Sequence, residues 1–155
     1  MPRHSETKHL PYTPDQMFDL VADVARYHEF LPWVTAVRVR SSSEAQVVAD
    51  LIVGFSAFTE RFTSRVTKDR SAKRITVDYL EGPLKYLKNE WRFDPAESGG
   101  STVFFSVDFA FRSRLFETVA GAVFDRALRK MTGAFEARAA ALYGASEPVG
   151  LTASG

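Results

Sequence analysis

The stretch from Ser113 to Tyr143 constrains the fold most, because it contains no proline and repeats apolar side chains at helical spacing. Ser113 is suited to an N-cap, Glu117 suits the positive end of a helix dipole, and Gly144 follows where helices commonly end. We predict one continuous helix here, about 46 Å long at 1.5 Å per residue. Its apolar stripe, which needs a partner surface, comprises Phe116, Val119, Ala120, Val123, Phe124, Ala127, Leu128, Met131, Ala134, Phe135 and Leu142.

Before this helix the hydrophobic period changes to two, between residues 33 and 112, as in half-buried β-strands. Clusters of turn-forming residues divide this segment into six strands, and residues 4–10 form a further strand candidate. A proline-started amphipathic pattern predicts a short helix over residues 14–24. Residues 25–32 are predicted to form a second short helix or a turn.

We therefore predict an α+β domain over residues 1–144, in which a curved antiparallel sheet of about seven strands wraps around a long C-terminal helix. Two short helices follow the first strand. A single helix cannot cover a strongly curved sheet completely, so we expect a space between them. Residues 145–155 are rich in Ala, Ser, Gly and Pro, and we predict a disordered tail there.

Composition excludes several classes of site. The net charge is +1 without a block of Lys or Arg, which argues against direct DNA binding. There is no cysteine, and His4, His9 and His28 lack the spacing of metal ligands, so we predict no metal site. No nucleophile motif occurs, and we predict no catalytic residue and no required cofactor. The polar N-terminus and the lack of a run of about 20 apolar residues predict a soluble, cytoplasmic protein.

The chain is rich in aromatic residues, with thirteen Phe, five Tyr and two Trp. These side chains either fill a packed core or line a cavity, and the small residues Ala120, Ala127 and Ala134 along the helix stripe leave room for a cavity. The candidate lining residues are Trp33, Phe55, Phe58, Phe62, Tyr79, Trp91, Phe105 and Phe109 on the sheet side, facing Val123, Phe124, Ala127 and Met131 on the helix.

Three polar residues fall on apolar faces. Glu60 alternates with apolar residues of its strand, and Asn89 lies between Leu87 and Trp91 on one face. Both are candidates to orient the polar head group of a ligand, and the alternative for Glu60 is a place at the rim, paired with a basic residue. Arg138 falls within the helix stripe, and a pair with Glu60 is one alternative to a solvent-facing head group.

Two turn-like segments carry large apolar side chains. We consider them as a portal that touches a membrane during lipid transfer, with Lys85 and Lys88 meeting anionic head groups. The alternative is that they turn inward and close the core. The candidate portal residues are Phe30, Leu31, Pro32, Leu84, Tyr86 and Leu87.

Five short strings, in this order along the chain, resemble the helix-grip (START-like) superfamily, and more narrowly its coenzyme Q-binding protein and polyketide cyclase-like branch. They are YHEFLPW at residues 27–33, FTSRV at 62–66, EGPLKYL at 81–87, NEWRF at 89–93 and AFEARA at 134–139. The resemblance extends from about residue 3 to residue 144, over most of the chain.

This resemblance implies a carrier or chaperone that binds ubiquinone or a similar polyisoprenoid lipid in a hydrophobic cavity and supports respiratory electron transport. It implies no bond-making step, and it extends the expected location to the periphery of the inner membrane. Relatives in the same branch are ribosome-association toxins, so binding to a ribosomal subunit is the first alternative. A polyketide cyclase/dehydrase-like enzyme is the second.

Overall fold

The computed structural model describes residues 3–55, 58–97 and 99–144 of the chain. The predicted tail, residues 145–155, lies outside these ranges. The elements follow the predicted order, and their bounds are β1 (Arg3–Leu10), α1 (Pro14–Ala22), the 3₁₀-helix η1 (Val24–Glu29), β2 (Val34–Ser42), β3 (Gln46–Phe55), β4 (Phe58–Asp69), β5 (Arg74–Glu81), β6 (Leu84–Pro95), β7 (Ser101–Phe111), α2 (Arg114–Arg129) and α3 (Met131–Tyr143).

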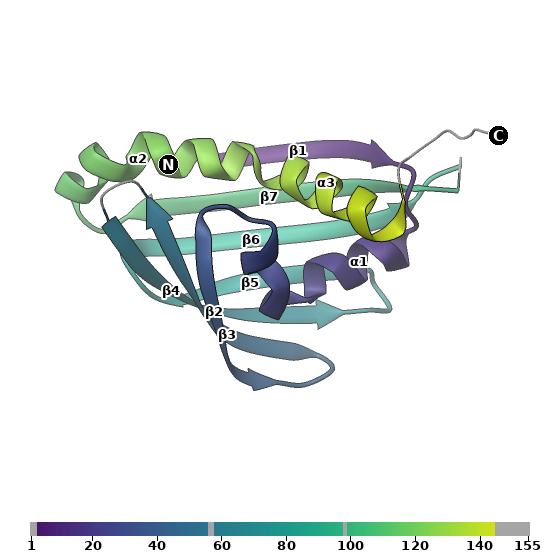
Figure 1. Cartoon of the computed structure of the whole chain (residues 1–155), viewed down its shortest axis with the longest axis horizontal. Helices are drawn as coiled ribbons and strands as arrows, with labels where there is room; N and C mark the ends of the chain where they lie inside the picture. Colours follow the sequence, from purple (N-terminus) through teal and green to yellow (C-terminus); the bar gives the residue numbers. More distant parts are fainter. Residues whose placement is uncertain (1–2, 56–57, 98, 145–155) are drawn as a thin grey trace.

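The strands form one antiparallel, seven-stranded sheet in the order β1-β7-β6-β5-β4-β3-β2. Strands β2 to β7 pair with their neighbours in sequence, as short turns dictate, and β1 completes the sheet by pairing with β7. Helix α2 contacts both β3 and β7, which are each second from opposite edges. The sheet therefore curls around the C-terminal helices, as Figure 1 shows, and the predicted helix-grip α+β fold is confirmed.

The prediction of one continuous C-terminal helix is wrong, because α2 and α3 meet in a bend at Lys130 (Figure 1). Hydrogen bonding continues through the bend: Lys130 N donates to Arg126 O at 3.1 Å and Ala134 N donates to Lys130 O at 3.0 Å. The next residues are the weak helix formers Thr132 and Gly133. Contacts with β1 hold the new direction of α3, since the Thr132 hydroxyl donates to Glu6 Oε1 at 2.7 Å and Lys8 pairs with Glu136.

Two residues of the predicted apolar stripe, Val119 and Leu142, point to solvent instead of to the sheet. Val119 is 56% exposed and Leu142 is 51% exposed. In α2 the face against the sheet is formed by Ala120, Phe124, Ala127 and Leu128, and Val119 is turned about 100° away from Ala120. In α3, Phe135 and Ala139 form the contact instead, which leaves Leu142 outward in the last turn.

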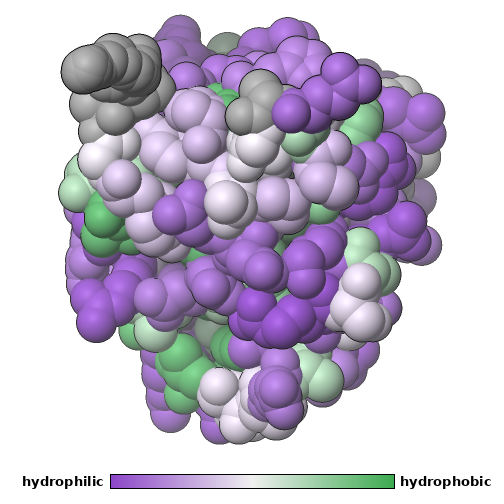
Figure 2. Space-filling view, turned by 90° about the vertical axis from the view of Figure 1, so that its right-hand side faces the viewer, coloured by the Kyte–Doolittle hydropathy of each residue, from purple (hydrophilic) through white to green (hydrophobic). Residues whose placement is uncertain are grey.

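Helix α1 packs against β5, β6 and β7 of the sheet and against α3. It begins with a Thr13 cap, a capping box in which Thr13 and Gln16 exchange hydrogen bonds. Its buried Phe18 packs edge-on against Phe93 of β6, with ring centroids 6.2 Å apart. Figure 2 shows the end of the molecule on the right of Figure 1, where the surface is mostly hydrophilic and hydrophobic residues form small separate areas. In the part of the chain that the structure describes, no helix is long and apolar enough to cross a membrane.

Candidate functional site: an apolar cavity under the C-terminal helices

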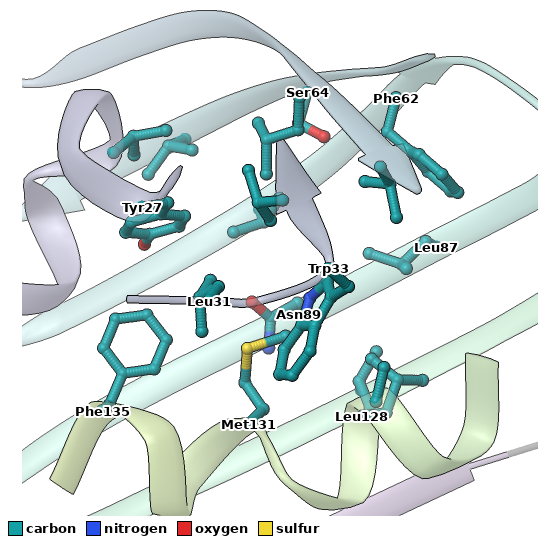
Figure 3. Close-up of a pocket in the computed structure, with 18 of the residues that line it drawn as sticks. Tyr27, Leu31, Trp33, Phe62, Ser64, Leu87, Asn89, Leu128, Met131 and Phe135 are labelled. Atoms are coloured by element: carbon teal, nitrogen blue, oxygen red, sulfur yellow. The ribbon is translucent and has the colours of Figure 1, made fainter. Parts of the chain in front are cut away.

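A cavity of about 140 Å³ lies between the concave face of the sheet, η1 and the α2–α3 bend, and it is partly open to solvent (Figure 3). Figure 3 shows Met131 and Phe135 pointing from the helical side toward the strands. The lining residues are Val24, Tyr27, Leu31, Trp33, Val34, Leu51, Val53, Phe62, Ser64, Val66, Val77, Leu87, Asn89, Trp91, Phe105, Val107, Phe124, Ala127, Leu128, Met131 and Phe135.

Strand periodicity explains why these residues meet. Every second residue of β4, from Phe62 to Val66, and of β6, from Leu87 to Trp91, faces the cavity. On the helical side, Ala127 contributes only a methyl group at a position where a larger side chain would fill the space. The hollow therefore depends on a small residue opposite a curved, aromatic-rich wall.

Contacts between aromatic rings stabilise the walls of the cavity. Trp91 lies 4.6 Å from Phe105 and 5.0 Å from Phe135, measured between ring centroids. Phe124 stacks on Phe62 at 5.9 Å. Aromatic pairs at such separations stabilise by about 0.5–1.5 kcal/mol beyond their area burial, so these contacts stabilise the walls.

Asn89 and Ser64 place neutral polar groups in the mostly apolar lining of the cavity. Asn89 Nδ2 donates to Ser106 O at 2.8 Å, and Asn89 Oδ1 accepts from Trp91 Nε1 at 3.1 Å. These two bonds fix the carboxamide and leave one amide hydrogen without a partner among the residues that the structure describes. Ser64 makes no side-chain hydrogen bond within the described residues. Asn89 and Ser64 therefore offer hydrogen-bond donors to the carbonyl or ether oxygens of a guest.

Tyr27 is the titratable residue among the described lining residues. Burial raises the pKa of the Tyr27 phenol, and the nearby Asp23 carboxylate raises it further. Its hydroxyl donates to Val21 O, and its ring packs edge-on against Phe135 at 5.3 Å. The phenol therefore stays protonated, and Tyr27 serves as part of the wall.

The structure places the predicted lining residues as follows. Those that line the cavity are Trp33, Phe62, Asn89, Trp91, Phe105, Phe124, Ala127 and Met131, with Leu31 and Leu87 from the portal set. Glu60, Tyr79, Phe109 and Val123 lie outside the lining. Tyr79 instead accepts a hydrogen bond from Leu84 N at 2.8 Å, and Phe109 packs against Phe124 at 4.9 Å. The side chains of Phe55 and Phe58 lie outside the described part of the structure.

The predicted alternative of an Arg138–Glu60 pair is wrong. Arg138 Nη2 lies 2.5 Å from Glu29 Oε1, and its guanidinium carbon lies 5.1 Å from the centroid of the Phe30 ring. Placement in the fold explains the difference, because Glu60 lies on β4 opposite Val53 of β3, whereas α3 packs against η1 through the rings of Phe135 and Tyr27. The hydrogen bond from Arg138 lowers the pKa of Glu29.

The portal candidates divide between core and surface. Leu31 is 2% exposed and Leu84 is fully buried, so these two follow the inward-facing alternative. Phe30 is half-buried, with its ring 5.0 Å from that of Phe135. Pro32 is exposed, and Tyr86 is half-buried with its hydroxyl 3.3 Å from Asp108.

Sequence reasoning missed several lining residues. Ser64 and Val66 continue the alternation that begins at Phe62, and Leu128 and Phe135 belong to the helix stripe, so the same patterns contain the signal. Val24 and Tyr27 carry no such signal, because only tertiary packing brings η1 to the cavity. Among the residues that the structure describes, no group of three or more His, Cys, Asp or Glu could hold a metal ion.

Comparison with known proteins agrees with this architecture. The protein-family model described as polyketide cyclase/dehydrase and lipid transport matches residues 10–136. The ribosome association toxin RatA of Rickettsia prowazekii is 37% identical over 136 residues, which cover 86% of this chain and 92% of that protein. The mitochondrial coenzyme Q-binding protein COQ10 homolog B of Xenopus laevis is 35% identical over 148 residues, covering 93% of this chain and 60% of that protein.

Among solved structures, the 18 kDa protein CC1736 of Caulobacter crescentus is 45% identical and superposes with a TM-score of 0.71. That alignment covers 93% of this chain and 99% of CC1736. The family match spans the elements from the end of β1 into α3, which are the elements that enclose the cavity. The chain therefore belongs to the polyketide cyclase/dehydrase and lipid transport family.

Proposed function

We propose that this protein binds ubiquinone or a similar polyisoprenoid lipid in the cavity and acts as a carrier or chaperone that supports respiratory electron transport. The observation that carries the proposal is the cavity itself: a hollow with apolar walls between the sheet and the C-terminal helices, with the neutral donors Ser64 and Asn89 among its lining side chains. The name of the Xenopus relative, a coenzyme Q-binding protein, supports this choice of ligand.

The size of the cavity limits what it holds. At about 140 Å³ it is close to the roughly 150 Å³ of an engineered cavity in another protein that binds benzene. One six-membered ring therefore fits, and a polyisoprenoid tail does not fit beside it. We propose that the head group occupies the cavity and that the tail leaves through its open side. Each CH₂ group that stays buried contributes about 0.8 kcal/mol.

The polar groups suit a quinone head. Quinone carbonyl and methoxy oxygens accept hydrogen bonds, and the Ser64 hydroxyl and the remaining amide hydrogen of Asn89 can donate them. Neither donor is charged, so the site favours a neutral ligand. β5 separates the two strands that carry these residues, and this places the two strands about 10 Å apart. That spacing allows oxygens on different sides of one ring to be contacted.

We propose carriage in preference to catalysis. The family description includes polyketide cyclases, whose chemistry needs groups that transfer protons. Tyr27 is the titratable side chain that the structure describes in the lining, and burial keeps it protonated. Because polyisoprenoid lipids reside in bilayers, we expect the protein to load at a membrane surface through transient contact.

The test is organic extraction of the purified protein, followed by mass spectrometry. We expect a quinone to co-purify in proportion to the protein when the host makes ubiquinone. Titration of lipid-free protein with short-chain ubiquinone provides a second readout, because both tryptophans of the chain, Trp33 and Trp91, line the cavity and should be quenched. A lipid-free preparation whose tryptophan emission is indifferent to the quinone would refute the carrier proposal.

Binding to a ribosomal subunit is the second candidate function. It is favoured by the RatA relatives, since the Rickettsia protein is 37% identical and the Escherichia coli protein is 34% identical, with 92% and 91% of their lengths matched. Co-sedimentation of the purified protein with separated ribosomal subunits tests it. Recovery of the protein only in the ribosome-free fraction would exclude this candidate.

A further inference from the structure

An arginine cluster surrounds one carboxylate on the outer face of the sheet, the face turned away from the cavity. Asp50 of β3 lies at its centre, directly opposite Arg38 of β2 and Thr63 of β4. A register shift beyond Val39 makes room for Arg40, whose side chain turns to the same outer face and reaches Asp50. These residues come from three strands that neighbour one another in the sheet (Figure 1).

Two further arginines complete the cluster. Arg61 and Arg65 each lie two residues from Thr63 on β4, so they share its outer face. The cavity-lining residues of β4, such as Phe62 and Ser64, alternate with them and face inward. The arginine cluster therefore comprises Arg38, Arg40, Arg61 and Arg65, residues that are scattered among acids in the sequence.

The central carboxylate is covered and satisfied. Asp50 is 1% exposed, its Oδ2 lies 3.0 Å from Arg40 Nε, and its Oδ1 accepts from the Thr63 hydroxyl at 2.7 Å. Burial opposes the charged form of Asp50, but the hydrogen bonds from Thr63 and Arg40 outweigh it and lower the pKa of Asp50. Asp50 therefore anchors Arg40 and presents little negative charge to solvent.

The other arginines are available to a partner. Arg38 is exposed and Arg65 is half-buried, and neither makes an ion pair or side-chain hydrogen bond within the described residues. Arg61 lies 3.4 Å from Glu81, but both side chains are more than half exposed, so this pair is weak. The exposed acids next to the cluster, Glu81 and Asp78, both lie on β5, at its border. Positive charge therefore predominates over β2, β3 and β4.

We propose that the arginine cluster is a docking surface for the phosphodiester backbone of folded RNA. Guanidinium groups form paired hydrogen bonds with phosphate oxygens, and proteins recognise RNA helices mostly through backbone contacts. The strands β2 and β4 lie about 10 Å apart, so the cluster spans more than one phosphate. This inference rests on the second candidate function, for which it names the chemical group recognised, and it is independent of the cavity.

The test is fluorescence anisotropy of a labelled RNA hairpin of about 16 base pairs, titrated with the full chain over a series of salt concentrations. The variant Arg38→Gln/Arg65→Gln removes two charges without breaking a side-chain hydrogen bond or ion pair among the described residues. We expect it to bind at least about tenfold more weakly and to flatten the dependence of log affinity on log salt by about one unit per lost phosphate contact.

The matched control is Arg74→Gln/Lys88→Gln, which removes the same charge from β5 and β6 on the same outer face. We expect its affinity for the hairpin to stay within about twofold of the parent protein. Thermal melting of both variants checks that they fold. Equal weakening by both variants, no binding of the hairpin by the parent protein, or preference for phosphatidylglycerol vesicles over RNA would overturn the inference.

Co-sedimentation of the same variants with ribosomal subunits separates the two proposals. If the parent protein and the arginine variant co-sediment equally, the ribosomal candidate stands and the arginine cluster is excluded as its contact. If the hairpin binds through the arginine cluster and no subunit is bound, the RNA surface stands and the ribosomal candidate fails.

Discussion

Arg138 of α3 and Glu29 at the end of η1 form an ion pair, with Nη2 and Oε1 2.5 Å apart. The pair joins the two elements that bring Tyr27 and Phe135 to the cavity wall. The Arg138 side chain is only 18% exposed, and its Nε has no hydrogen-bond partner in the part of the chain described. Glu29 is therefore the principal partner of a mostly covered cation.

We expect Glu29→Gln to lower the melting temperature, because Arg138 then loses its charged partner. The hydrogen bond from Arg138 lowers the pKa of Glu29 in the folded state. The stabilisation is thus fully present above the unfolded pKa of 4.5 and is lost as pH falls through the folded value. Melting curves of both proteins from neutral pH to pH 3 should converge at the acidic end.

The control for this prediction is Asp125→Asn, which removes an exposed ion pair with Arg129 on the surface of α2. We expect a smaller change in melting temperature at every pH. An equal effect of the two substitutions would show that the Glu29–Arg138 pair has no special role.

We expect Ala127→Phe to abolish quinone binding, because the added ring occupies the cavity at the point where α2 faces the strands. Ala122→Phe adds the same ring to the exposed side of the same helix and should leave binding unchanged. Tryptophan quenching by short-chain ubiquinone measures both. Unaltered binding by Ala127→Phe would place the ligand outside the cavity.

Ser64→Ala separates binding from stability. The hydroxyl faces the cavity without a protein partner among the described residues, so its removal should change the free energy of unfolding by less than about 0.5 kcal/mol. Loss of one hydrogen bond to the ligand should weaken quinone binding by about 1 kcal/mol, or roughly fivefold. Urea unfolding and quinone titration provide the two measurements, and unchanged affinity would remove Ser64 from the proposed contacts.

Thr132→Val tests what holds the bend between α2 and α3. It keeps the shape of a 6% exposed side chain but removes the hydrogen bond to Glu6, which should lower the free energy of unfolding by about 1.5–3 kcal/mol. Thr118→Val, on the exposed side of α2, removes a hydrogen bond to Arg114 O and should cost far less. Chemical denaturation compares them, and similar values would mean that backbone propensity alone makes the bend.

Local sequence patterns predicted most of the fold. Alternation and turn residues determine the strands and their antiparallel pairing, and the proline-started pattern after Thr13 gives α1. These signals are local, because each depends only on side chains within a few residues. The bend between α2 and α3 was not predicted, because the hydrogen bond that helps to hold it joins Thr132 to Glu6, which is far from Thr132 in sequence.

The sequence by itself indicated which residues face inward along the strands and, apart from positions such as Val119 and Leu142, along the C-terminal helices. It therefore indicated eight of the residues that line the cavity: Trp33, Phe62, Asn89, Trp91, Phe105, Phe124, Ala127 and Met131. Tertiary structure alone decided three further features: the contribution of Tyr27 to the wall, the pairing of Arg138 with Glu29, and the gathering of the arginines around Asp50. The physical reason is that periodicity fixes the direction of a side chain, whereas its neighbours depend on strand register and helix placement across the whole chain.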